Sequence, residues 1–192
     1  MKKINKLLLL AFSVLGFLGS TLAASTPSLG IAARFGVLSS TFSITTATTV
    51  HGDVGYTTLS NPLLTVVGGG IFVPSPSQAG IDQGTALADL NSQPCTFSFA
   101  AGAIDLATDI THGPLGVYTG GVYCTTTAAG AMSIGAAGIT LSGAGTFIFR
   151  TSAPSNALTT LANSIVVLTG GASACDVFWT HCSDNAWSGL SV

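Results

Sequence analysis

Histidine, cysteine and acidic residues, which carry out most of the chemistry in protein sites, are few in this chain. It has three histidines, seven aspartates, four cysteines and no glutamate. His51, His112 and His181 are not accompanied by an Asp or Ser pattern of the nucleophile-elbow type. No glutamate is available to share acid–base work. The sequence therefore predicts that the chain is not an enzyme and takes no cofactor.

Three local patterns have a chemical and a structural interpretation. Asp105 and Asp109 could contact calcium, but their spacing is not that of a calcium-binding loop, so we interpret them as solvated loop acids and predict no metal site. Gly68–Gly70 resembles a phosphate loop but no lysine follows it, which indicates a turn. We interpret Asp53 as a side-chain cap at a corner of the chain.

Charge is scarce and unevenly placed. Charged residues make up 6% of the sequence, against about a quarter in typical globular proteins. Beyond the first six residues, two arginines oppose seven aspartates, a net charge of −5. This excludes a nucleic-acid-binding protein, which needs many cations to displace counterions from phosphates. The 47% hydrophobic content excludes disorder. The five cations are Lys2, Lys3, Lys6, Arg34 and Arg150.

Residues 1–24 have the layout of a secretory signal peptide. A basic start is followed by an apolar run over 7–18 and then by small residues, with cleavage expected after Ala23 or Ala24. The apolar run is too short to span a bilayer comfortably, which disfavours a retained anchor. We expect one mature domain over 25–192 that is secreted and has no membrane contact after cleavage.

Export changes the interpretation of the four cysteines. None forms a CxxC pair or lies at zinc-ligand spacing beside a histidine. In an oxidising compartment disulfides are the default. Cys95 and Cys124 bracket one segment, so we predict a bond between them. A second bond between Cys175 and Cys182 remains open.

Most of the chain consists of short β-type runs separated by small residues. Hairpin turns of the Asn-Gly or Asp-Gly kind are absent between them. Short strands with small-residue corners and few hairpins indicate an all-β solenoid, in which each strand stacks on the coil below. The runs are Phe35–Leu38, Ser43–Thr46, Thr49–Gly55, Val66–Val67, Gly138–Leu141, Thr146–Phe149, Ser164–Leu168 and Cys175–Trp179.

One segment, 75–93, predicts an amphipathic helix instead. Serine and proline at its start favour a capped first turn, and Pro94 prevents continuation. In the strands, alternation places Phe147 and Phe149 on one side and Ile148 on the other. Both sides are apolar, so we expect the coil interior to cover one and the helix to cover the other. The apolar helix positions are Ala79, Ala86, Leu87 and Leu90.

Threonine and serine recur at outward positions of other strands. Ile139 and Leu141 alternate with hydroxyl residues, and a second hydroxyl pair follows at 159–160. Stacked coils about 4.8 Å apart, with alternate residues about 6.7 Å apart along a strand, would place these groups on a rigid uncharged grid. Such a grid can order water, and ice is one natural ligand; the alternative is an ordinary soluble β surface. The candidate ice-binding residues are Thr140, Ser142, Thr159 and Thr160.

Several motifs together resemble the DUF3494-type ice-binding (antifreeze) family over about Leu29 to Trp179. The resemblance implies a right-handed β-helix of triangular section with a long α-helix packed along one face. It also implies a secreted, non-enzymatic protein that binds an ice crystal surface, and it suggests that 95–124 is a capping insert; we expect a monomer. The motifs are Leu29–Ser39, His51–Gly55, the 75–93 helix, Gly116–Tyr118, Gly145–Arg150, Ala157–Thr160, Ser164–Ala172 and Cys175–Trp179.

The segment 180–192 departs from the family pattern. We interpret it as an atypical tail, frameshifted or truncated, which would leave an unpaired sheet edge. The sequence leaves two other function classes to consider. An extracellular adhesion or cell-envelope module would use the same solenoid as a spacer. A polysaccharide-acting β-helix enzyme would need clustered acids and bases, which two arginines and scattered aspartates do not supply.

Overall fold

The computed structural model describes residues 23–42, 47–59, 63–126, 130–152 and 158–181. In this part of the chain, short strands accompany one α-helix, α1 (Ser77–Ser92), and two 3-10 helices, η1 (Gly30–Arg34) and η2 (Ala174–Asp176). The strands before α1 are β1 (Phe35–Leu38), β2 (Thr41–Phe42), β3 (Thr48–His51), β4 (Asp53–Gly55), β5 (Thr58–Leu59), β6 (Leu64–Val67) and β7 (Ile71–Phe72). Those after it are β8 (Phe97–Ser98), β9 (Ile104–Asp105), β10 (Val117–Tyr118), β11 (Gly121–Cys124), β12 (Met132–Ile134), β13 (Ile139–Ser142), β14 (Phe147–Thr151), β15 (Leu158–Thr160), β16 (Val166–Thr169) and β17 (Val177–His181).

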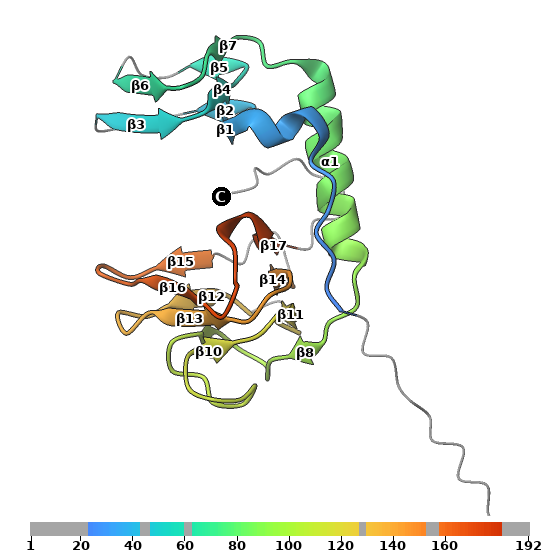
Figure 1. Ribbon diagram of the computed structural model, residues 1–192, viewed down its shortest axis with the longest axis vertical. Coiled ribbons are helices and arrows are strands. Elements are labelled where there is room, and N and C mark those ends of the chain that lie inside the picture. Colours follow the sequence, from blue (N-terminus) through green and yellow to red (C-terminus); the bar gives the residue numbers. More distant parts are fainter. Residues whose placement is uncertain (1–22, 43–46, 60–62, 127–129, 153–157, 182–192) are drawn as a thin grey trace, which may run out of the picture.

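Successive turns of the chain stack as coils. The strands before α1 form parallel sheets ordered β1-β4-β7, β2-β5 and β3-β6, which we call the N-terminal stack. Those after α1 form parallel sheets ordered β17-β14-β11-β8, β15-β12-β9 and β10-β13-β16, the C-terminal stack. Figure 1 shows α1 running alongside both stacks. The prediction of stacked parallel strands with one helix is confirmed.

One predicted strand is divided by a corner. The sequence predicts a single run over 49–55, but the structure places its two halves in different sheets, as parts of β3 and β4. Gly52 has φ +94°, a conformation that favours glycine, and it turns the chain between them. The expected strand at 43–46 and the tail residues 182–192 lie outside the described residues.

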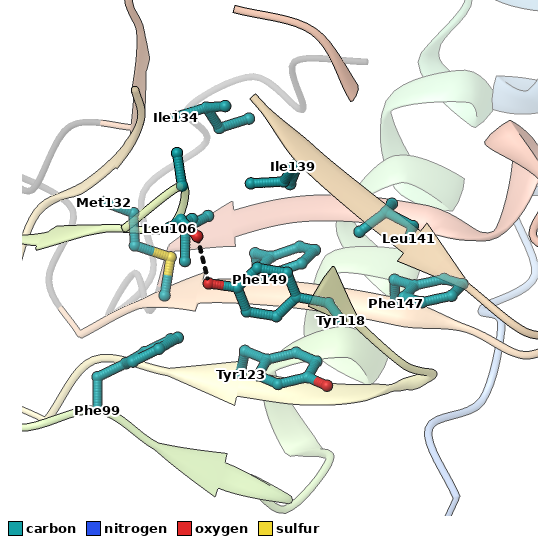
Figure 2. Packing of buried hydrophobic residues seen from close by; sticks show 11 residues of the cluster. Phe99, Leu106, Tyr118, Tyr123, Met132, Ile134, Ile139, Leu141, Phe147 and Phe149 are labelled. Atoms are coloured by element: carbon teal, nitrogen blue, oxygen red, sulfur yellow. Dashed lines mark hydrogen bonds between the residues drawn. The ribbon is translucent and has the colours of Figure 1, made fainter. Parts of the chain in front are cut away.

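The interior of the C-terminal stack is a closely packed aromatic and aliphatic cluster (Figure 2). Tyr118 is fully buried, and its hydroxyl donates to the Leu106 carbonyl at 2.8 Å. Burial raises the pKa of this phenol far above its usual value, so it stays a donor. Phe149 stacks on Trp179 of the next coil, with ring centroids 4.3 Å apart. This packing fixes the positions of the outward residues on the same strands.

The other side of the same sheet is covered by α1. Ile148 and Phe178 pack with Leu90 of the helix in a second buried cluster, as the alternation predicted. Of the predicted apolar helix positions, Ala79, Ala86 and Leu90 are buried and Leu87 is half-buried. The start of the helix differs from the prediction. Pro76 occupies the N-cap and no side chain caps the first turn.

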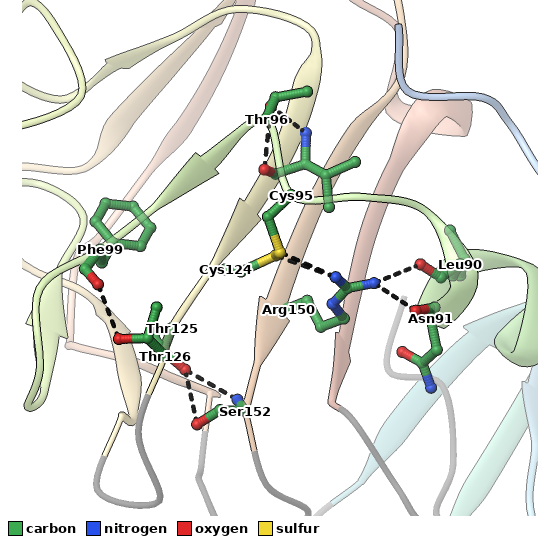
Figure 3. The surroundings of a disulfide bond; sticks show 11 residues. Leu90, Asn91, Cys95, Thr96, Phe99, Cys124, Thr125, Thr126, Arg150 and Ser152 are labelled. Atoms are coloured by element: carbon green, nitrogen blue, oxygen red, sulfur yellow. Dashed lines mark hydrogen bonds between the residues drawn. A yellow bond between two sulfur atoms is a disulfide. The ribbon is translucent and has the colours of Figure 1, made fainter. Parts of the chain in front are cut away.

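A disulfide and a buried arginine join α1 to the coils (Figure 3). Cys95 and Cys124 are bonded, as predicted, and tie the segment after α1 to β11. Arg150 of β14 donates to the Leu90 and Asn91 carbonyls at 3.0 and 2.8 Å, and also contacts both sulfurs. Both carbonyls lie in the last turn of α1, where carbonyls have no N–H partner within the helix. Cys175 is exposed, and Cys182 lies outside the described residues.

Candidate functional site

Asp105, Asp109 and His112, which could carry out chemistry, make structural hydrogen bonds instead. One Asp105 oxygen accepts from the Ala107 and Gly135 N–H groups at 2.9 and 2.8 Å. Asp109 accepts from Thr111 and contacts His112. These carboxylates are therefore hydrogen-bonded and half-buried, which corrects their interpretation as solvated loop acids. Within the described residues, no group of three His, Cys or Asp side chains could hold a metal ion.

Asp53 joins two corners of the N-terminal stack, as its interpretation as a cap predicted. Its carboxylate accepts from the Gly70 N–H at 2.8 Å and pairs with the Arg34 guanidinium. The Gly70 hydrogen bond lowers the pKa of this carboxyl, burial opposes the effect, and Arg34 adds to the lowering. The segment Gly68–Gly70 turns with φ +71° at its first glycine, so it serves as a turn.

In the part of the chain that the structure describes, α1 packs against the sheet of the C-terminal stack that contains β14 and β17. We call the outward side of β10-β13-β16 the β13 face and the outward side of β9-β12-β15 the β12 face. Figure 1 shows both sheets directed away from α1. No helix in the described part of the chain has the length and hydrophobicity to cross a bilayer.

The β13 face carries two rows of uncharged side chains. Ile139 and Leu141 of β13 are buried, whereas Thr140 and Ser142 are half-exposed on the opposite side. Pairing with the neighbouring strands places Val117 and Val167 beside Thr140, and Thr169 beside Ser142. The β13 face is therefore formed by Val117, Thr140, Ser142, Val167 and Thr169.

Glycine sets the corner where β13 begins. Gly138 has φ +72°, and a Cβ there would clash with the Ile165 carbonyl of the next coil. Only glycine allows this close approach without strain. The neighbouring coils thereby stay in contact at the edge of the β13 face, which keeps its rows aligned.

The other two candidates lie on a different sheet. Thr159 of β15 is in register with Ser133 and Asp105, so it belongs to the β12 face. Thr160 is in register with Ile134, which is buried, and so lies on the interior side of its strand. This corrects the expectation that all four side chains point outward, because consecutive residues in a strand point to opposite sides.

The N-terminal stack continues the same pattern. Each complete coil contributes one strand to each of three sheets, in the same order in both stacks. The third strand of a coil is β3 or β6 in the N-terminal stack and β10, β13 or β16 in the C-terminal stack, so these strands are equivalent. Thr49 and Thr65 pair on the exposed side, followed by His51 and Val67. Figure 1 shows β3 and β6 extending to the same side of the molecule as β13 and β16. Threonine and valine thus recur on both stacks.

Sequence reasoning missed Val117, Val167 and Thr169 as neighbours of Thr140 and Ser142. The runs Gly138–Leu141 and Ser164–Leu168 contained the signal, since placing their final leucines side by side also brings Thr140 beside Val167. A search for hydroxyl residues alone passes over valine. A valine differs from threonine by a methyl in place of the hydroxyl and presents a similar shape to a flat ligand.

Comparison with known proteins agrees with this architecture. A solved ice-binding protein from the Antarctic ascomycete Antarctomyces psychrotrophicus is similar, with TM-score 0.64 and 23% identity over 82% of this chain and 78% of that one. An ice-binding protein from an Antarctic biological consortium gives TM-score 0.64 and 24% identity over 83% and 70%. One from an Antarctic Flavobacteriaceae bacterium gives 0.58 and 27% over 83% and 37%.

These structures share the arrangement of coils and helix seen here. No curated protein matches the sequence significantly. The sequence profile of the ice-binding-like family matches residues 21–189, most of the chain. The chain therefore belongs to the ice-binding-like family.

Proposed function

We propose that this chain is a secreted ice-binding protein that adsorbs to ice through the β13 face and so inhibits crystal growth and recrystallisation. Family membership supports the ligand. The observation that carries the choice of face is its two uncharged rows, including Val117–Thr140–Val167, held in register by parallel pairing. Neighbouring strands about 4.8 Å apart give a rigid spacing that ordered water can match.

The β12 face is the less suitable of the two. Its outward row includes the Asp105 carboxylate, which brings a charge into the row that also contains Thr159. Its strands have two or three residues each, whereas β13 and β16 have four. A longer, uncharged strand pair presents a larger flat surface. We therefore keep Thr140 and Ser142 in the site and place Thr159 and Thr160 outside it.

The remaining features of the proposal follow from family membership and sequence. We infer a right-handed β-helix of triangular section, with a signal peptide that ends at Ala23 or Ala24 and with 95–124 as a cap over one end. The protein acts outside the cell, binds ice and catalyses no reaction. It acts as a monomer, because a single chain contains the whole β13 face. The outermost coil, with β8, β9 and β10 at the sheet edges, supports the capping role.

The test compares matched arginine substitutions on the two faces. Thr140→Arg places a bulky charge in the middle of the β13 face, so we expect recrystallisation inhibition to fall about tenfold, a loss of about 1.4 kcal/mol of adsorption. Thr159→Arg makes the same change on the β12 face and should leave inhibition unchanged. Circular dichroism and thermal unfolding check that both variants fold.

Full inhibition by Thr140→Arg rejects the β13 face. If Thr159→Arg alone loses inhibition, the site moves to the β12 face. A wild-type protein in whose presence ice crystals grow as they do in buffer overturns the proposed function itself.

A further inference from the structure

The residues that follow the predicted signal peptide form a packed strap against the C-terminal stack. Ala24 contacts the buried cluster that joins Leu90 of α1 to Ile148 and Phe178 of the coils. Pro27 is also buried. Ala23, one residue earlier, is exposed. Ala24 is therefore the first of the described residues that packs against this cluster.

A buried glutamine holds the next residue of the strap. The Ser25 N–H donates to Gln93 Oε1 at 2.8 Å, and Gln93 Nε2 donates to the Ser25 carbonyl at 2.8 Å. Gln93 directly follows α1 and is 9% exposed. The carbonyl and the NH₂ of the Gln93 amide both bond the backbone of Ser25. Without these partners, burial of the amide would lower the stability of the folded protein.

The strap also reaches the last described coil. The Thr26 hydroxyl is 2.7 Å from the Thr146 hydroxyl and donates to Asp176 at 2.9 Å. Thr146 precedes β14, and Asp176 ends η2 just before β17. Residues 24–27 thus connect the end of α1 with two neighbouring coils, and Figure 1 shows the strap running beside the helix.

We propose that export processing hydrolyses the Ala23–Ala24 bond, so that Ala24 is the first residue of the mature protein and is retained for this packing. The inference rests on the secretion part of the proposed function. An export protease adds water across the amide: the C–N bond breaks, Ala23 gains the hydroxyl as a carboxylic acid, and Ala24 gains the proton as an amine.

The sequence around the two candidate bonds supports the same choice. Signal cleavage sites have small residues in an A-x-A-like arrangement, one and three positions before the bond. Cleavage after Ala23 puts Thr21 and Ala23 at these positions. Cleavage after Ala24 would put the larger Leu22 three positions before the bond. It would also remove Ala24 from the cluster that it packs against.

The first experiment expresses the full-length chain in an exporting host and determines the start of the exported protein by intact mass and N-terminal sequencing. We expect the chain to begin at Ala24. A chain that begins at Ser25 or later overturns this inference and leaves secretion standing. A chain that keeps Met1 overturns secretion together with the inference.

A matched pair of variants tests the bond independently of folding, because processing is measured by mass under denaturing conditions. Ala23→Leu places a bulky residue directly before the proposed bond, so no product beginning at position 24 should form. Ala24→Leu lies after that bond and should still be cut there. The opposite pattern, with Ala23→Leu processed normally and Ala24→Leu blocked, assigns the cut to the next bond and overturns the proposal.

Discussion

At the scale of single residues, His112 is the most informative side chain outside the β13 face. It is buried, its ring stacks on Tyr118 at 3.9 Å, and its Nδ1 lies 2.6 Å from Asp109 Oδ2. Its Nε2 lies 3.0 Å from the Val117 carbonyl. Both ring nitrogens therefore lie within hydrogen-bond distance of an oxygen atom. This holds the loop between β9 and β10 against the core.

The same contact predicts a loss of stability in acid. Burial raises the pKa of the Asp109 carboxyl, but hydrogen bonds from His112 and Thr111 outweigh it and hold the pKa below 3.8. The stabilisation is present above the unfolded value, near 3.8, and is lost as pH falls through the lower folded value. We expect Asp109→Asn to cost about 1–3 kcal/mol at pH 7 and to flatten the acid decline, measured by urea unfolding across pH.

Asp89→Asn is the matched control, since Asp89 is exposed on α1. It should leave both the stability and its pH dependence unchanged. If an Asp109→Asn variant loses stability in acid as steeply as the wild type, the Asp109 carboxylate is not the source of the acid sensitivity.

Residue roles could be predicted only where alternation decides them. Thr140 and Ser142 follow from the buried Ile139 and Leu141 between them. Thr160 does not, because which side of β15 faces inward is set by its pairing with β12. His112 and Asp109 are three residues apart, a spacing equally typical of a solvated loop. Only the packed core around Tyr118 distinguishes the two.

At the scale of elements, Arg150 links α1 to β14. It is 7% exposed, and its guanidinium bonds two carbonyls at the end of the helix. The adjacent disulfide joins two residues that are 29 positions apart. By lowering the entropy of the unfolded chain, it contributes about 3–4 kcal/mol to the free energy of unfolding. The covering of one sheet by α1 therefore depends on polar contacts as well as on Leu90.

Removal of this arginine should destabilise the protein. Arg150→Met leaves the Leu90 and Asn91 carbonyls buried without a donor, so we expect a cost of about 1–3 kcal/mol in the free energy of unfolding by denaturant. Arg34→Met is the control: the Arg34 side chain is 60% exposed in its ion pair, and exposed pairs contribute about 1 kcal/mol or less. Equal losses in the two variants would argue against the helix-anchoring role.

Elements were predictable from composition, but their boundaries were not. Each predicted β-run other than 43–46, which lies outside the described residues, contains strand residues, and the 75–93 helix is recovered as α1. The corner at Gly52 depends on its positive φ. Glycine can adopt this conformation but also ordinary strand conformations, so the sequence alone does not predict the corner. The start of α1 depends on Pro76, whose fixed φ suits the N-cap and leaves the expected serine cap unused.

At the scale of the whole molecule, few hairpin signals and small-residue corners predicted coils of parallel strands. They did not predict two stacks joined by one helix, because a strand sequence does not reveal which coil lies beside which. In the described residues, β15, β16 and β17 stand at the edges of their sheets. The interior-facing Leu158, Val166 and Leu168 of this edge are 36, 40 and 38% exposed.

An edge with exposed apolar side chains predicts self-association as concentration rises, since unpaired strands recruit further strands. Leu168→Lys puts an inward-pointing charge on this edge and should shift association, measured by sedimentation velocity, to higher concentration. Leu115→Lys is the control: Leu115 is 60% exposed but lies in a loop outside the strands. If both lysines reduce association equally, general charge repulsion explains the effect. A wild-type protein that stays monomeric at every concentration shows that the edge is protected, and the association prediction is then wrong.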